Sequence, residues 1–324
     1  MAIRLDGDSI EFHFPEVDDA ARMRVSFQRT ARVPDDGHEY GLPAGFGRFP
    51  LRRVADLMRA PRSWQRSGGV VMPMWQSEAC WLTFDVEDGY PFLVTVGCGG
   101  VNAVTGGTWS PEPDFESEDY FEVPEQPWLD GFCVGSGVVR QFVAMPLDSA
   151  YTVEQQVTGE ASVGGIQIAV VPLKSEVYRE RYAARAEPDF GIGMALPCAS
   201  AADSMGLAAG GSIAQSIATP VEPQNNWEST SGSSLTVHIA NSAVWAEVTG
   251  SEPPTLPLSA AEYTEMGVPW FTWYDDTLAR AGSATLSKVA SVFDLGRERR
   301  EQPLPENESF DPPEPVVLGP RVQA

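Results

Sequence analysis

Three short runs rich in Val, Ile, Phe and Thr follow one another in the middle of the chain, separated by Gly, Pro, Asp and Ser. They cover residues 138–145, 151–157 and 164–174. β-Branched and aromatic side chains suit the pleated, half-buried surface of a strand, and the separating residues are those that turns prefer. The stretch from residue 124 to residue 174 therefore predicts three strands of an antiparallel sheet.

Polar residues interrupt these apolar runs. Arg140 and Gln141 lie within a run of Val and Phe, and Gln167 lies between two isoleucines. Alternation along the strand places Arg140 and Gln141 on opposite faces, so both faces carry a polar group. A buried polar group needs a hydrogen-bond partner. We therefore predict a polar network in the core and take Arg140, Gln141 and Gln167 as candidate binding residues.

Other segments favour the same fold class. Residues 10–14 and 23–27 alternate apolar and polar members, which is typical of paired strands. Residues 235–240 and 243–248 also have the composition of strands. A charged helix is predicted over residues 176–187, and Ser259 and Glu262 have the spacing of a capping box. The Gly-rich residues 205–212 predict a loop or a packing seam of small residues, whose amides are a possible anion cradle.

The expected architecture is mainly β, as a β-sandwich or as barrel-like antiparallel sheets with a few short helices. It becomes α+β toward the C-terminus. A change of character after Lys174 divides the chain into a β-rich part, residues 1–174, and a mixed part, residues 175–300. Residues 301–324 are rich in proline, which removes backbone donors, and are expected to form an arm without a core of its own.

Charge limits the partners of this chain. It has 45 acidic and 22 basic residues and a net charge of -23. Such a field repels phosphate backbones and anionic lipid, so we expect neither nucleic acid nor a membrane surface as a partner. The charge serves solubility or attracts a cation or a basic partner, and both alternatives stay open.

The expected location is the cytoplasm. Acidic residues appear near the start of the chain before any apolar leader develops, and no apolar run reaches the length of a bilayer span. The four cysteines are scattered without the spacing of metal ligands, so we expect buried thiols and neither a metal nor another cofactor.

Catalytic candidates are few. Glu78 has two tryptophans and a cysteine close to it in sequence, and burial there would raise its pKa and suit it to acid–base chemistry. The alternative is that Glu78 faces water or pairs with an arginine. A glycosidase-like pair needs a second carboxylate, for which the candidates are Asp130, Glu154 and Glu160. His238 is a further candidate, although neither a Cys nor a Ser motif accompanies it, and a hydrogen-bonded structural role is the alternative.

An aromatic cluster follows Pro269. Trp270, Trp273 and Tyr274 either pack in the apolar core or form a surface that binds a sugar or a protein partner.

Two functions remain. The first is a non-enzymatic binding module or assembly subunit, either a homo-oligomer joined through the C-terminal arm or a protein with another protein partner. The alternative is a carboxylate-based hydrolase that uses Glu78 and a partner acid.

Overall fold

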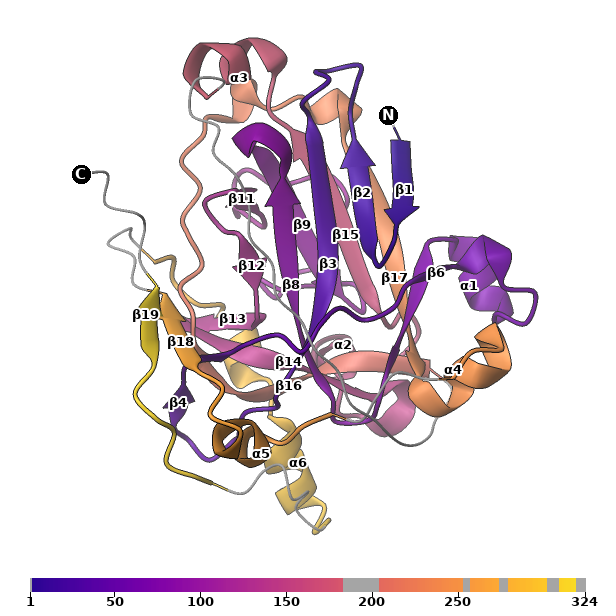
Figure 1. Cartoon of the computed structure of the whole chain (residues 1–324), viewed down its shortest axis with the longest axis vertical. Coiled ribbons are helices and arrows are strands. Elements are labelled where there is room, and N and C mark those ends of the chain that lie inside the picture. The colour runs from indigo at the N-terminus through magenta and orange to yellow at the C-terminus, as the bar shows by residue number, and fades with distance from the viewer. Residues whose placement is uncertain (1, 183–203, 253–256, 274–278, 302–308, 319–324) are drawn as a thin grey trace.

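One sheet of sixteen strands forms most of the protein (Figure 1). The structure is a computed structural model that describes residues 2–182, 204–252, 257–273, 279–301 and 309–318. From edge to edge the sheet runs through β1 (Ala2–Asp6), β2 (Ser9–His13), β3 (Arg22–Thr30), β8 (Ala79–Val86), β14 (Val138–Pro146), β16 (Ser204–Ala214), β17 (Ser233–Asn241), β15 (Ile166–Pro172), β9 (Phe92–Cys98) and β10 (Val101–Asn102).

Shorter strands extend this sheet. They are β4 (Glu39–Tyr40), β6 (Arg52–Arg53), β7 (Val70–Met74), β11 (Phe121–Val123), β12 (Trp128–Leu129) and β13 (Gly131–Gly135). Most neighbouring strands are antiparallel, whereas β7 runs parallel to β17 and β4 runs parallel to β16. A second sheet has three strands, β5 (Leu42–Pro43), β18 (Trp270–Trp273) and β19 (Val316–Leu318).

The two halves of the large sheet stack on each other. Strands β1, β2, β3 and β8 stand upright in front of β9, β15 and β17, and β14 and β16 cross below them (Figure 1). Aromatic contacts join the two halves: the rings of Phe14 and Phe92 are 6.0 Å apart, and those of Phe84 and Phe121 are 5.2 Å apart. The apolar core therefore lies between the halves, as in a sandwich.

The mainly β, antiparallel fold class is confirmed. Among the described strands, the sheet ends at β1 and β10 and does not close into a barrel. The boundary expected near Lys174 falls between β15 and the helix that follows it. Strands β16 and β17 lie beyond that boundary and join the same sheet as the N-terminal strands.

The helices are short and lie around the sheet. They are α1 (Arg62–Ser67), α2 (Val153–Thr158), α3 (Ser175–Arg181), α4 (Ser242–Thr249), α5 (Ala260–Glu265) and α6 (Val292–Glu298). Helix α5 begins at the predicted capping box, in which Ser259 and Glu262 bond each other's backbone amides. In the described part of the chain, no helix has the length and apolar character that a membrane crossing requires.

Two predicted strands are wrong. Residues 153–157 lie in helix α2, because the Thr152 side chain accepts a hydrogen bond from the Gln155 amide and Gly159 ends the helix in the left-handed conformation. Residues 243–248 lie in α4, which covers β7 and β17 instead of continuing β17.

The Gly-rich segment is a strand within the sheet, β16, and it packs as a seam of small residues. A Cβ at Gly211 would lie 2.2 Å from the Pro34 carbonyl oxygen, so only glycine allows this approach.

The proline-rich arm docks on its own chain. Strand β19 pairs with β18, and the Phe310 ring lies 5.4 Å from Tyr40 and 5.7 Å from Trp270.

Candidate functional site

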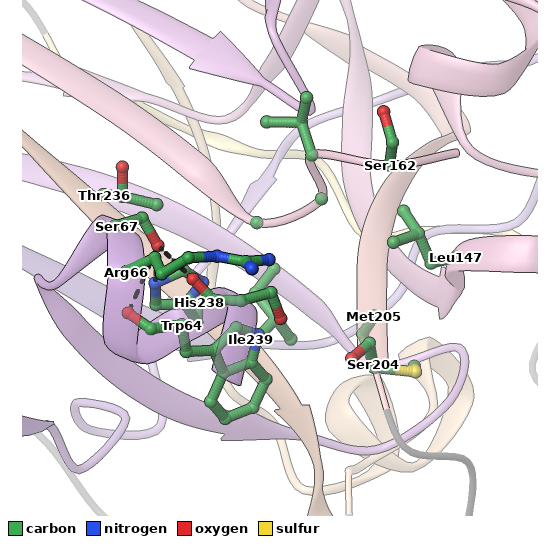
Figure 2. A pocket seen from close by; sticks show the side chains of 14 residues that line it. Trp64, Arg66, Ser67, Leu147, Ser162, Ser204, Met205, Thr236, His238 and Ile239 are labelled. Carbon is green, nitrogen blue, oxygen red and sulfur yellow. Dashed lines mark hydrogen bonds between the residues drawn. The ribbon is translucent and has the colours of Figure 1, made fainter. Parts of the chain in front are cut away.

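A pocket of about 380 Å³ opens between helix α1, strand β17 and the loop before β15 (Figure 2). Helix α1 forms one side, and the loop forms the opposite side together with Leu147. The start of β16 forms the end of the pocket. The lining residues are Ser63, Trp64, Arg66, Ser67, Leu147, Ser162, Val163, Gly164, Gly165, Ser204, Met205, Thr236, His238 and Ile239.

Two glycines allow the walls to approach β17 closely. Gly69 and Gly165 have φ angles of 85° and 62°, in the left-handed region. A Cβ at Gly69 would lie 2.0 Å from the Thr236 carbonyl oxygen, and one at Gly165 would lie 2.3 Å from the Val237 carbonyl oxygen. These contacts place the end of α1 and the loop on either side of His238.

His238 is buried and fixed in orientation. Its ring stacks on Trp64 with 5.1 Å between the ring centroids. Nε2 lies 2.9 Å from the Gly68 carbonyl oxygen and 3.2 Å from Ser67 Oγ. Because a carbonyl oxygen only accepts, Nε2 carries the hydrogen and is not available as a base toward Ser67. Burial lowers the pKa of His238, so the ring is neutral at pH 7.

Glu154 and Gln167 hold the opposite wall in place. The Glu154 carboxylate is buried and accepts hydrogen bonds of 2.7–2.8 Å from the amides of Ser162, Val163 and Gly164. Gln167 donates to the Gly164 carbonyl oxygen at 2.9 Å and accepts from the Gly100 amide at 2.8 Å. Both residues were candidates from the sequence, and both act as supports behind the lining.

Arg66 gives the pocket its charge. Its guanidinium extends from α1 into the space between the walls (Figure 2). None of the lining residues is acidic, and Arg66 makes no ion pair within the described part of the chain. The pocket is therefore a positively charged site in a chain whose net charge is -23.

No family model, curated protein or solved structure matches this chain. Within the described ranges, no group of three His, Cys, Asp or Glu side chains is placed to hold a metal ion. The chemistry of the pocket lining is thus the basis for a functional proposal.

The arginine that lines the pocket was missed in the sequence, although a signal was present. Residues 41–77 contain six arginines and a single acidic residue, Asp56. In so acidic a chain, a local excess of positive charge marks a surface of different chemistry.

The four candidate carboxylates do not line this pocket. Glu78 is buried and receives two hydrogen bonds from Arg29, at 2.8 and 3.0 Å, and one from the Trp75 amide at 2.9 Å. Burial raises the pKa of Glu78, and these donors oppose the shift. Glu160 lies exposed on the surface.

Asp130 is buried without a cation beside it among the described residues. Gln215 Nε2 donates to its carboxylate at 2.5 Å, and the Asp130 amide donates to Gln215 Oε1 at 3.0 Å. Burial raises the pKa of Asp130 to about 8. The side chain is therefore largely protonated at pH 7.

The predicted polar network is divided between two faces of β14. Gln141 is buried, accepts from the Val33 amide at 2.9 Å and donates to the Ala31 carbonyl oxygen at 2.9 Å. The Arg140 side chain is 25% exposed, and its Nη1 lies 3.7 Å from Asp35 Oδ1. Gln141 ties β14 to the segment after β3, whereas Arg140 is half-buried on the other face beside Asp35, whose side chain is 9% exposed.

The aromatic cluster is partly in the core. Trp270 is buried, with its ring 5.1 Å from Tyr263 and 6.1 Å from Tyr40. The backbone of Trp273 lies in β18, but its side chain and the whole of Tyr274 lie outside the described residues.

Proposed function

We propose that this protein is a binding module without catalysis that holds a small organic anion in the pocket between α1 and β17. The observation that carries the proposal is the Arg66 guanidinium. It extends into the pocket, has no carboxylate partner among the described residues, and is positive in a strongly acidic chain. A carboxylate or phosphate group is the natural partner of an unpaired guanidinium.

The rest of the lining suits a ligand with an apolar part. Leu147, Val163, Met205 and Ile239 provide apolar contact. Hydroxyl groups that can orient a polar head are those of Ser63, Ser67, Ser162, Ser204 and Thr236. The volume of about 380 Å³ is in the range of pockets for small molecules. We therefore infer an amphiphilic anion rather than a bare inorganic ion.

Binding is favoured over catalysis by the state of the titratable groups. His238 Nε2 is committed to the Gly68 carbonyl oxygen, so the nearby Ser67 has no base at this nitrogen. The carboxylates of the hydrolase alternative lie outside the pocket, and Glu78 is paired with Arg29. Glu154 supports the wall from behind the lining and Glu160 is exposed, so no observation favours that alternative.

A cytoplasmic location is part of the proposal. Cys80, Cys98 and Cys133 are free and buried, as is usual in a reducing compartment.

The test is isothermal titration calorimetry of the full chain with phenyl phosphate, inorganic phosphate and benzyl alcohol in low-salt buffer. We expect phenyl phosphate to bind best, because benzyl alcohol lacks the charge and inorganic phosphate lacks the apolar part. Arg66→Gln should weaken phenyl phosphate binding at least about tenfold, as expected for loss of a charge-assisted hydrogen bond.

The matched control is Arg62→Gln, which removes a charge from the same helix outside the pocket lining. This variant should bind phenyl phosphate like the wild type. Equal affinity of the wild type and Arg66→Gln, or equal losses in the two variants, would overturn the proposal.

A further inference from the structure

A second feature of the chain lies next to the pocket but is independent of it. We name it the arginine surface and define it as Arg52, Arg53, Met58, Arg59 and Arg62, all of which are exposed. These residues come from β6, the segment around the 3-10 helix Val54–Asp56, and the start of α1. In Figure 1, β6 and α1 lie together at one edge of the molecule, beside α4.

A buried apolar cluster supports the arginine surface. Val54, Trp64, Val71, Ala240 and Trp245 are buried in one apolar cluster beneath it, which joins the segment to β7, β17 and α4. Arg59 Nη1 also donates to the Glu247 carbonyl oxygen at 3.4 Å. The segment that carries the arginine surface is therefore held in place by its packing against β7, β17 and α4.

Its charges are largely unneutralised. Arg53 forms an ion pair with Asp56, in which Arg53 Nε lies 2.9 Å from Asp56 Oδ2. Within the described residues, Arg52, Arg59 and Arg62 make no ion pair. Surface cations in so acidic a chain would ordinarily find a carboxylate, so their isolation at one edge leaves an attractive surface for a negative partner.

Met58 adds an apolar anchor to the arginine surface. Its side chain is 97% exposed, more than that of any other exposed large hydrophobic residue in the described part of the chain. Arg and Met are both enriched at protein–protein interfaces, and the flexible thioether adapts to an irregular partner. A basic rim around a projecting methionine therefore fits a protein surface of negative charge.

The geometry points to a second copy of this chain as that partner. Outside residues 41–77 the chain carries 44 of its 45 acidic residues and 16 of its 22 basic residues. Most of the surface of a second copy is thus complementary to the arginine surface. The contact joins the arginine surface of one copy to an acidic surface of the other; it closes as a two-fold dimer if both surfaces lie on one face of the molecule, and otherwise builds rings or chains of molecules.

The experiment is multi-angle light scattering of the full-length protein over a range of concentrations, at about 50 mM and about 500 mM salt, because salt screens exposed charges. We expect the wild type to exceed its monomer mass of 35.1 kDa at high concentration in low salt and to approach that mass in high salt. Arg59→Glu with Arg62→Glu should stay at the monomer mass under all these conditions, and Met58→Glu should associate more weakly than the wild type.

The matched control is Arg300→Glu, an exposed arginine on the segment after α6. Its charge change equals that of Arg59→Glu alone, which should associate more weakly than the wild type, whereas Arg300→Glu should associate like the wild type. Melting temperatures of all variants show whether each is folded. A wild type that stays at 35.1 kDa, or a folded Arg59→Glu/Arg62→Glu variant that associates like the wild type, would overturn the proposal.

Discussion

Asp130 is a buried carboxyl group whose ionisation departs from its ordinary behaviour in a way that pH can test. Its pKa of about 8 in the folded protein lies above the value of 3.8 for a solvated aspartate. The folded state therefore holds a proton that the unfolded state releases. Between about pH 4 and pH 8, this group makes the protein less stable as the pH rises, by up to about 1.4 kcal/mol per pH unit.

Asp130→Asn removes this dependence because asparagine stays neutral. We expect the stability of the variant relative to the wild type to improve steadily from pH 5 to pH 8 and to level off above pH 8. Chemical denaturation of both proteins at several pH values measures the difference. Parallel pH profiles would show that Asp130 ionises as an ordinary aspartate.

Gln141 and Arg140 provide a matched pair of neighbouring polar residues. Gln141→Leu leaves the Val33 amide and the Ala31 carbonyl group unpaired in the core, which should cost about 2 to 4 kcal/mol of unfolding free energy. Arg140→Leu removes a long, half-buried ion pair and leaves Asp35, whose side chain is 9% exposed, without this cation; it should cost less, about 1 to 2 kcal/mol. Urea unfolding of both variants tests the order, and a larger loss for Arg140→Leu would contradict it.

At the residue scale, the sequence was informative where a polar side chain interrupted an apolar run. Gln141 and Gln167 were singled out in this way, and both are buried and hydrogen-bonded. The environment of Asp130 could not be predicted, because its partner Gln215 is 85 residues away in the chain.

The loop that forms one wall of the pocket depends on a close approach to β17. Gly165→Ala would place a Cβ 2.3 Å from the Val237 carbonyl oxygen in a left-handed conformation. We expect it to lower the melting temperature and to weaken binding of phenyl phosphate, because the wall must move away from His238. Backbone strain and overlap together should cost about 2 to 4 kcal/mol.

Gly159→Ala is the control for this substitution. Gly159 also has a left-handed φ, of 79°, but no atom lies within 4 Å of its Cβ position. It should cost only about 1 kcal/mol, from backbone strain alone. Equal destabilisation by the two substitutions would mean that the approach of Gly165 to β17 is not tight.

At the element scale, the alternation of apolar and polar residues predicts the strands well, but the composition of short helices does not distinguish them from strands. Strands β2 and β3 pair as their patterns predict. The six residues of α2 resemble a strand in composition, and only the Thr152–Gln155 spacing and Gly159 signal a helix. Helix α4 was misread because Val, Trp and Ala suit either a strand or a buried helix.

The whole molecule separates its charges. Residues 41–77 carry six arginines and a single acidic residue, and the segment from β6 to α1 lies at one edge of the molecule, whereas the rest of the chain carries 44 acidic and 16 basic residues. The fold class followed from the sequence, but the pocket did not. The pocket forms where three segments meet: helix α1, the loop that precedes β15, and strand β17. The loop is about 100 residues beyond α1 in the chain, and β17 is about 70 residues beyond the loop.

The most direct test of the pocket as the binding site is a methyl-detected NMR titration of the full-length protein with phenyl phosphate. We predict that the methyl signals of Leu147, Val163, Met205 and Ile239 shift with saturation, while that of Ile10, in the core away from the pocket lining, stays in place. Saturable shifts confined to other methyl groups, or no shifts at millimolar phenyl phosphate, would contradict a binding site between α1 and β17.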